Sequence, residues 1–583
     1  MLAIVEFTIS YIHNCDKNSK CDKICYECFH FFTLLKNFLV HRKKKLNMIP
    51  EQEDGNVEYK LKLLNNDEFR IERLASQMRF RCNEGCGECI YNLGVEDDGT
   101  MSGISDQEFQ KTIKCITSAA EMNSYLVTEL TKTCVDDDKY VYELLIREIN
   151  DETYIDVKVA IAGSVDCGKS TLLSVLTNGK ADDGRGSARL AVFNFPHEIV
   201  SGRTSSVGHQ ILGYDMFGNI MNYKSNRVRT WPNIVQQSSK IISFFDLAGH
   251  EKYLKTTIYG LASGKPDVCF IMVGGNRGVL KMTVEHIFLC KNLNIPFCII
   301  ITKIDMTKGK ENVLEDTINS IYTLLRKPGI RRIPMKIKTH DDIVRSALNI
   351  HTESIVPIFS ASNVTMEGIK DIHTFLNLCP KKKTQINEEE AFECHIDIAW
   401  NVQGVGTVIG GHIISGKVKC GDKMWFGPND NKYVQITIRT LHCKKVPVQE
   451  ASNNTYVCMA VRGISKENVN KGNVVVERKN QQILCERIIA DVEVLVTHST
   501  TIKPGYQPLM HASNVRTCVE IEDIRNKVNA RSSKLSDDNI LRTGDTAEVT
   551  LKIVFRKQFV KAGTTILLCE GRTKVVGYIK KIC

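Results

Sequence analysis

The stretch GSVDCGKST, residues 163–171, limits what this chain can fold into more than any other feature. It follows the apolar run VKVAIAG (157–163) and precedes TLLSVLTNG, which has helical character. A loop of the form G-x-x-x-x-G-K-[ST] between a strand and a helix is typical of a phosphate-binding P-loop. Its backbone N–H groups cradle phosphate oxygens, aided by the positive end of the following helix. The pattern therefore predicts an α/β P-loop domain, and the alternative is a chance glycine-rich turn.

The side chains of this loop have separate expected tasks. We expect Lys169 to reach the β- and γ-phosphates and the Ser170 hydroxyl to bind Mg²⁺. The other expected phosphate contacts are Gly163, Ser164, Val165, Asp166, Cys167, Gly168 and Thr171.

Four later apolar runs match further strands of the same sheet. They are separated by helical stretches, which predicts a mostly parallel sheet with crossover helices. In such a sheet the ligand lies at the carboxyl ends of the strands. The runs are KIISFFD (240–246), VCFIMVG (268–274), FCIIITK (297–303) and SIVPIFS (354–360).

The run that ends at Asp246 continues into the turn DLAGH. A nucleotide-bound Mg²⁺ needs an acidic ligand, direct or through water, and Asp246 is expected to supply it. Gly249 can offer its N–H to a γ-phosphate, a contact that hydrolysis removes, so the loop is expected to switch. His250 is then placed to orient the attacking water, although a lone histidine after a turn is usually a surface residue.

The last two strand ends predict a guanine base. Asp305, in TKID, can accept two hydrogen bonds from the guanine N1–H and exocyclic amine, a pair that adenine cannot supply. The aliphatic stem of Lys303 can lie over the base. Backbone N–H groups of the motif SAS are expected to meet the guanine oxygen. The expected base contacts are Thr302, Lys303, Asp305, Ser360, Ala361 and Ser362, and the expected cofactors are GTP or GDP with Mg²⁺.

The whole chain is too long for one core, at 583 residues. After about residue 391 helical patterns fade and short β-rich segments with glycine turns follow, which favours two small barrels. We expect an N-terminal extension (1–56), disordered or untranslated before Met48, a small α+β domain (57–152), the P-loop domain (153–384) and β-barrels at 385–482 and 483–583.

Composition excludes some classes of protein. With 43% apolar and 25% charged residues, the chain has the makeup of an ordinary globular protein. The run FHFFTLLKNFLV (29–40) is too short to span a bilayer, and the N-terminus lacks the features of a signal peptide. We therefore expect a cytoplasmic monomer without a membrane partner, with its 22 cysteines reduced. The net charge of +10 favours an anionic partner.

Two cysteine clusters share the spacing C-x₃-C-x₂-C, which also occurs where thiolates hold an iron–sulfur cluster or zinc. Against a radical enzyme, no large barrel can fit between the second cluster and the P-loop. Gly85 and Gly87 indicate a turn with incidental thiols instead, and we favour that interpretation. The clusters are Cys21, Cys25 and Cys28, and Cys82, Cys86 and Cys89.

Taken together, these motifs resemble the translational GTPases typified by elongation factor Tu, and their eukaryotic relatives named GTP-binding protein one and two. The resemblance runs from about residue 81 to 583. It includes GRGSARL, HEIVSGRTSSVGHQILGYD, FFDLAGHEKYLKTTIYG, GVGTVIGG, LRTGD and EGRTKVVG.

The resemblance implies a GTPase domain followed by two β-barrels. It also implies that Thr204 closes on Mg²⁺ and the γ-phosphate, that Asp246 is the Mg²⁺-associated acid and that His250 is the catalytic histidine activated by the ribosome. Hydrolysis would then proceed by positioning and charge stabilisation, with little covalent chemistry.

The chain departs from the family pattern at three places. Thr302 stands where most GTPases have asparagine, so guanine specificity leans on Asp305. Ala248 replaces a proline of the elongation-factor switch. Arg203 occupies the place of the apolar partner of Val165 in the gate around the histidine, which implies a looser or differently controlled gate.

Two functions of different classes follow from these features. In the first, the chain is a translational GTPase whose GTP form binds aminoacyl-tRNA and whose hydrolysis is triggered at the ribosome. In the second, it is a GTP-switched scaffold for RNA turnover or ribosome quality control that delivers no tRNA. His250 and the two barrels favour the first function, and the extra N-terminal domain favours the second. Arg572 and Lys574 suit an RNA backbone or an exposed edge strand equally.

Overall fold

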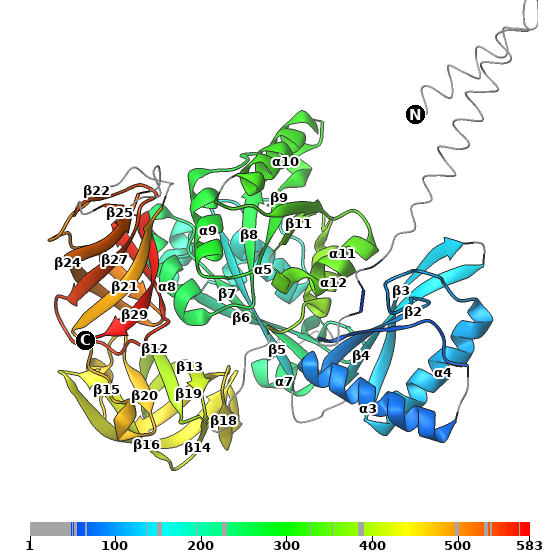
Figure 1. Ribbon diagram of the computed structural model, residues 1–583, viewed down its shortest axis with the longest axis horizontal. Coiled ribbons are helices and arrows are strands. Elements are labelled where there is room, and N and C mark those ends of the chain that lie inside the picture. The colour runs from blue at the N-terminus through cyan, green and yellow to red at the C-terminus, as the bar shows by residue number, and fades with distance from the viewer. Residues whose placement is uncertain are drawn as a thin grey trace, which may run out of the picture.

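The computed structural model describes most of the chain from residue 48 to residue 583 (Figure 1). The expectations about residues 1–47, including the first cysteine cluster, lie outside the described residues. So do the side chains of Arg572 and Lys574. The gaps after residue 48 are 49, 52–54, 65–66, 137, 149–153, 194, 224–229, 310, 328, 353, 383–389, 496–500, 530–534, 537–538 and 571.

The first unit is a four-stranded sheet with two helices, in the order β1-β2-β4-β3. Strands β3 and β4 pair antiparallel and form a hairpin. A capping box starts α4: the Ser105 side chain accepts from the N–H of Glu108, and the Glu108 side chain accepts from the N–H of Ser105. The elements are β1 (Val57–Lys60), α3 (Glu68–Glu84), β2 (Glu88–Leu93), α4 (Asp106–Met122), β3 (Tyr125–Asp136) and β4 (Lys139–Glu148).

The central sheet has seven strands in the order β10-β11-β9-β8-β5-β7-β6. All neighbours pair parallel except β6 and β7, so the prediction of a mostly parallel sheet is confirmed. The strands are β5 (Ile155–Gly163), β6 (Gly208–Tyr214), β7 (Lys240–Asp246), β8 (Val268–Gly274), β9 (Phe297–Thr302), β10 (Ile333–Lys336) and β11 (Ile355–Ser360).

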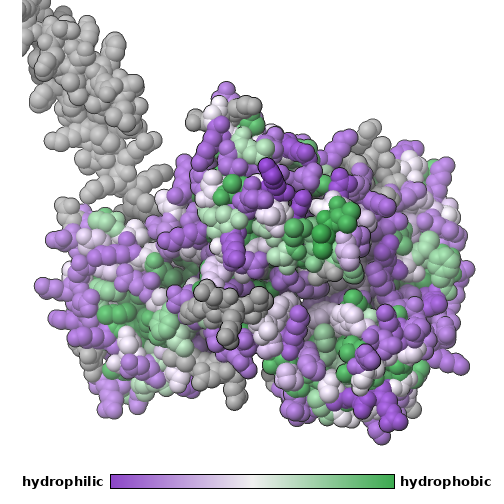
Figure 2. Space-filling view, turned by 180° about the vertical axis from the view of Figure 1, so that it is seen from behind, coloured by the Kyte–Doolittle hydropathy of each residue, from purple (hydrophilic) through white to green (hydrophobic). Residues whose placement is uncertain are grey.

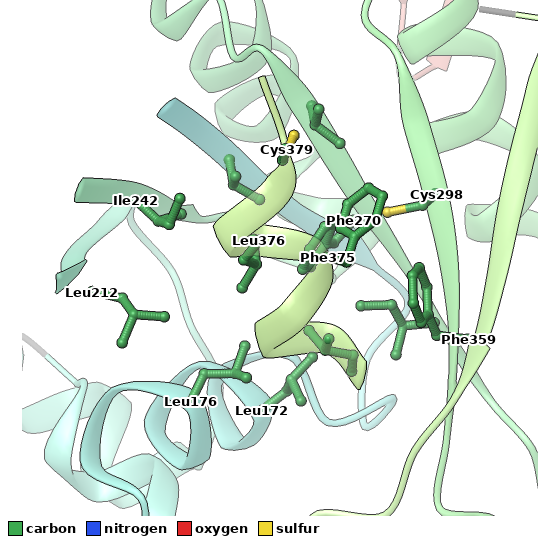
Figure 3. Packing of buried hydrophobic residues seen from close by; sticks show 14 of the residues in the cluster. Leu172, Leu176, Leu212, Ile242, Phe270, Cys298, Phe359, Phe375, Leu376 and Cys379 are labelled. Atoms are coloured by element: carbon green, nitrogen blue, oxygen red, sulfur yellow. The ribbon is translucent and has the colours of Figure 1, made fainter. Parts of the chain in front are cut away.

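Helices cover both faces of the central sheet (Figure 1). One apolar cluster joins the sheet to α5, α11 and α12, and Figure 3 shows Phe270 of β8 against Phe375 of α12 within it. The other joins the opposite face to α8, α9 and α10. The helices are α5 (Lys169–Asn178), α6 (Pro196–Ser201), α7 (Trp231–Gln236), α8 (Leu254–Gly264), α9 (Lys281–Asn292), α10 (Glu311–Arg326), α11 (His340–Leu348) and α12 (Ile369–Leu378).

Two β-barrels follow the central sheet, as expected. In the first, the ring β15-β20-β12-β13-β19-β16 is closed by pairing of β15 with β16. Its strands are β12 (Glu393–Val402), β13 (Gly406–Ser415), β15 (Lys423–Asn429), β16 (Lys432–Cys443), β19 (Tyr456–Arg462) and β20 (Val474–Val476), with the short β14 (Lys417–Lys419), β17 (Val446–Val448) and β18 (Glu450–Ser452) beside them.

The second barrel is closed in the same way. Its ring is β23-β28-β29-β21-β27-β24, and β23 pairs with β24. Its strands are β21 (Arg487–Val494), β23 (Leu509–Ala512), β24 (Val515–Val528), β27 (Thr546–Ile553), β28 (Thr565–Glu570) and β29 (Arg572–Ile582), with the short β22 (Thr501–Ile502), β25 (Leu535–Ser536) and β26 (Leu541–Arg542).

A buried group of charges joins the N-terminal sheet to the central sheet. Glu88 of β2 accepts from Lys240 of β7 at 2.8 Å and from Arg147 of β4 at 2.9 Å. Arg147 also donates to the backbone oxygen of Asn377 in α12 at 3.2 Å. The side chains of Glu88, Lys240 and Arg147 are at most 3% exposed. We call these three residues the buried ion triad.

The first barrel also contacts the central sheet through polar groups. Lys444, in the turn after β16, lies 2.8 Å from Asp156 of β5. The Tyr259 hydroxyl of α8 donates to Asp397 of β12 at 3.0 Å. Polar side chains cover most of the face seen in Figure 2. Of the helices that the structure describes, none is both long and apolar enough to cross a membrane.

Candidate functional site

The predicted P-loop connects β5 to α5. Gly168, at the start of α5, has φ +85°, in the region that glycine adopts without strain. The Lys169 ammonium folds back on the loop and donates to the carbonyls of Gly163 at 3.1 Å and Ser164 at 2.9 Å. A polar pocket opens over this loop. Its lining is Val165, Asp166, Gly168, Lys169, Ser170, Thr171, Arg189, Gly202, Arg203, Thr204, Gly249 and His250.

Three of the predicted metal ligands meet beside this pocket. The Ser170 hydroxyl lies 2.6 Å from Oδ2 of Asp246 and 2.8 Å from Oγ1 of Thr204, which itself lies 3.4 Å from Oδ2 of Asp246. The other carboxylate oxygen, Oδ1 of Asp246, is buried without a hydrogen-bond partner. Burial raises the pKa of Asp246 from its ordinary value.

This oxygen cluster fits Mg²⁺. Carboxylate and hydroxyl oxygens are the donors that hard divalent cations prefer. A cation would also relieve the two costs of the present arrangement, namely a buried carboxylate and an oxygen without a partner. Ser170, Thr204 and Asp246 are therefore the residues that would hold it, directly or through water.

Gly249 lies directly against the P-loop. A Cβ at this position would lie 2.3 Å from the Lys169 nitrogen and 2.6 Å from the Gly163 carbonyl oxygen. The loop is held from behind by the Thr257 hydroxyl, which donates to the Ala248 carbonyl at 2.6 Å. Only glycine therefore permits this approach of the loop to the phosphate site.

His250 lines the same pocket and is partly exposed. Its Nδ1 accepts a hydrogen bond from the backbone N–H of Lys252 at 3.1 Å. This bond orients the ring and leaves Nε2 available for another partner. The expected catalytic histidine is thus next to the expected phosphate contacts.

The expected base contacts lie beyond the phosphate pocket and connect to it through Thr302. The Thr302 hydroxyl donates to the Cys167 carbonyl of the P-loop at 2.7 Å. Asp305 accepts from the Ser362 hydroxyl at 2.5 Å, which joins the ends of β9 and β11. Lys303, between Thr302 and Asp305 in the sequence, has its backbone in the left-handed region, with φ +60°.

The SAS segment differs from the expectation. The N–H of Ala361 donates to the Ile301 carbonyl at 2.8 Å, and the N–H of Ser362 donates to the Glu367 carbonyl at 2.9 Å. These two groups are therefore engaged within the protein and are not free for a guanine oxygen. Ser360 is still part of β11.

Two pocket residues were missed by the sequence analysis. Arg189 and Gly202 both line the pocket, and a Cβ on Gly202 would lie 2.9 Å from the Arg189 guanidinium. The only sequence signal was their place in GRGSARL and SGRTSS, because no strand end points to either residue.

The second cysteine cluster is spread over α3 and β2. The sulfurs of Cys82 and Cys89 are 3.0 Å apart and buried, and Cys86 is partly exposed. Burial raises the pKa of Cys89 well above its usual range. Among the described residues, no three or more His, Cys, Asp or Glu side chains are grouped so that they could hold a metal ion.

Comparison with known proteins shows similarity to GTPases. The family described as Elongation factor Tu GTP binding domain matches residues 156–384, and Elongation factor Tu domain 2 matches residues 406–476. GTP-binding protein 1 of Xenopus laevis is 38% identical over 537 residues, covering 91% of this chain and 79% of that protein. GTP-binding protein 2 of Homo sapiens is 36% identical over 544 residues, covering 91% and 88%.

The chain is also similar, at lower identity, to elongation factors. Elongation factor 1-alpha of Pyrococcus abyssi is 26% identical over 412 residues, covering 68% of this chain and 89% of that protein. The structure of translation elongation factor SelB from Methanococcus maripaludis with the GTP analogue GppNHp superposes with a TM-score of 0.53. It is 18% identical and covers 74% of this chain and 80% of that chain.

Proposed function

Because this chain belongs to the family of GTP-binding protein 1 and GTP-binding protein 2 and is a GTPase of the elongation factor Tu type, we propose that its GTP form binds aminoacyl-tRNA and that the ribosome triggers hydrolysis. The observation that carries the proposal is the meeting of Thr204 and Asp246 at the Ser170 hydroxyl, with His250 in the same pocket. Two closed barrels and the similarity to elongation factors support the tRNA part.

The residues of the pocket would act mainly by positioning. Lys169 would move its ammonium from the two loop carbonyls to the phosphates. Mg²⁺, when bound, would neutralise phosphate charge. Thr204 and the N–H of Gly249 would hold the γ-phosphate until it leaves, and His250 would orient the attacking water. When the γ-phosphate leaves, the segments that contain Thr204 and Gly249 would lose these contacts and open.

We also propose the expected setting of this activity. The regions 57–152, 153–384, 385–482 and 483–583 would act as the four units of a cytoplasmic monomer. Its partners would be the ribosome and aminoacyl-tRNA.

A second candidate function rests on the N-terminal sheet. The buried ion triad fixes this sheet to the strand that ends in the switch residue Asp246. The surface of the N-terminal sheet would then bind RNA-turnover or quality-control factors differently in the GTP and GDP states. In this alternative the chain is a GTP-controlled scaffold that carries no tRNA.

The test is GTP hydrolysis by the purified full-length chain, alone and with ribosomes that have an empty A site. Charged and uncharged tRNA are compared, and His250→Ala is run beside the exposed control His340→Ala. We expect strong stimulation by ribosomes that only His250→Ala abolishes, with GTP binding intact, and selective binding of charged tRNA. Absence of stimulation with either tRNA would reject tRNA delivery and leave the scaffold.

A further inference from the structure

Because residue 302 is threonine and not asparagine, the end of β9 carries no side-chain amide. Its single hydroxyl donates to the Cys167 carbonyl at 2.7 Å and lies 3.3 Å from the Val273 carbonyl. A hydroxyl can donate one hydrogen bond, and in Thr302 the Cys167 carbonyl accepts it. Thr302 therefore links the base site to the P-loop but offers no donor to the base.

Asn363, at the end of the neighbouring strand β11, brings an amide to the same place. Its Nδ2 lies 3.3 Å from the position that a Cβ on Gly168 would occupy, and the Thr302 hydroxyl lies 3.9 Å from that position. The residue before it, Ser362, is bonded to Asp305. Asn363 thus lies beside the P-loop, and it follows the serine that binds the carboxylate expected to read guanine.

The side chain of Asn363 is buried but incompletely bonded. The residue is 8% exposed, and its backbone carbonyl accepts from the N–H of Asp182 at 2.8 Å. Its Oδ1 is buried and has no hydrogen-bond partner. Buried amide oxygens without partners are rare in folded proteins. Because Oδ1 is only an acceptor, the donor that this side chain can offer to a ligand is Nδ2, on the side of the P-loop.

We propose that the side-chain amide of Asn363 donates a hydrogen bond to the O6–N7 edge of guanine, in place of the amide that Thr302 lacks. This edge of guanine carries two acceptors, whereas adenine carries an amino donor at C6. With Asp305 on the opposite N1–N2 edge, the base is read from both sides. The assignment deepens the proposed function, because it rests on guanine-nucleotide binding at this site.

The experiment measures the affinity of the full chain for GDP, 7-deaza-GDP and 6-thio-GDP by calorimetry. The first analogue lacks N7 and the second has a weak acceptor at C6. We expect the wild type to bind at least one analogue about tenfold more weakly than GDP. Asn363→Ala and the similarly sized Asn363→Leu should weaken GDP binding by about tenfold and abolish discrimination against that analogue.

A second variant, which restores an amide to the site, distinguishes loss of a base contact from a general structural effect of the Asn363 substitution. Thr302→Asn added to Asn363→Ala returns an amide to the site from β9, and it should recover both GDP affinity and discrimination. Val364→Ala, at a neighbouring side chain that is 40% exposed, is the matched control and should behave like the wild type. Melting temperatures of all variants establish that they are folded.

Two results would overturn the assignment. One is discrimination against the analogues that persists in both Asn363 variants, and the other is a wild type that binds all three nucleotides equally. A wild type that binds no GDP would instead count against the proposed function. Discrimination that is lost at residue 363 and recovered at residue 302 supports the assignment.

Discussion

Single atoms decide how closely the switch loop approaches the phosphate site. The hydrogen of Gly249 faces the Lys169 ammonium and the Gly163 carbonyl, where a methyl group cannot fit. The Ser170 hydroxyl touches both Thr204 and Asp246, so three segments meet at one oxygen. Small substitutions at these two positions should therefore have large effects on nucleotide binding.

Gly249→Ala should weaken GTP binding more than GDP binding, because the added methyl displaces either the loop or the Lys169 amine. We expect a GTP-specific loss of about tenfold or more, checked by titration with fluorescent GTP and GDP. Gly264→Ala is the matched control, since a Cβ there would meet Phe245 at an ordinary 3.8 Å. Equal losses for both nucleotides would contradict the expected role of the loop.

Ser170→Ala should remove the dependence of nucleotide affinity on Mg²⁺. The hydroxyl is one of the three oxygens that would hold the ion, and alanine leaves the carboxylate of Asp246 without this partner. Affinity is measured with Mg²⁺ and with a chelator. The control is Ser174→Ala, one helical turn further along α5. A Mg²⁺ effect that survives in Ser170→Ala would exclude this ligand.

At the residue scale the sequence predicts which motifs form the site, but it does not predict which of their N–H groups are already hydrogen-bonded within the protein. Asp246, Thr204 and Ser170 were expected together and lie together. The motif SAS predicts N–H groups that are free to bind guanine, but the pairing of β11 with β9 continues to Ala361. Hydrogen bonding across a sheet depends on the neighbouring strand, and a local motif does not contain that information.

At the scale of elements, β7 joins two functions in one strand. It begins at Lys240, in the buried ion triad, and ends at Asp246, in the oxygen cluster. The ion triad and the oxygen cluster are therefore at the two ends of one strand of seven residues. The N-terminal sheet is thereby connected to the nucleotide pocket.

Lys240→Met should destabilise the chain by about 2 kcal/mol, because Glu88 loses one charged hydrogen-bond partner but keeps Arg147. Urea unfolding measures the change in the first transition. Lys419→Met is the control, since its partner Glu450 and Lys419 itself are 40% and 67% exposed. We expect less than about 1 kcal/mol there. Similar losses in both variants would contradict a special role of the triad.

The strands that sequence reasoning found are those with continuous apolar runs. The expected β7 and β8 agree in every residue with the structure. Two strands of the same sheet, β6 (GHQILGY) and β10 (IPMK), were missed. Each lies at an edge of the sheet and needs apolar residues on one face only, so neither shows a continuous apolar run.

At the scale of the whole molecule, buried histidines lie where the units meet. His209 of β6 packs against Phe245 at 5.2 Å and against Tyr456 of the first barrel at 5.8 Å. His412 of the same barrel lies 4.8 Å from Tyr456. Burial lowers the pKa of His209 to about 4 and that of His412 well below its usual range. Burial therefore disfavours the charged form of both rings in the folded chain.

Stability should therefore fall as the pH falls from about 6.5 towards 4. In this window unfolded histidines bind protons that the buried ones do not, and the free energy of unfolding decreases. Burial raises the pKa of Asp397 to about 6, and proton uptake by this group opposes the effect in part. Urea midpoints at pH 7.5 and pH 5.0 measure the balance, and His209→Phe should reduce the difference. A midpoint that is equal at both pH values would contradict this expectation.

The buried ion triad also limits how such a chain can have evolved. Buried Lys240 of the central sheet is unfavourable without Glu88 of the N-terminal sheet, whereas Glu88 also has Arg147 of its own sheet as a partner. The N-terminal sheet could not be exchanged for an unrelated one without first passing through a form in which Lys240 has no opposite charge. The N-terminal sheet and the GTPase domain are thus expected to be inherited as a pair, whereas a flexible linker would have allowed them to be shuffled freely.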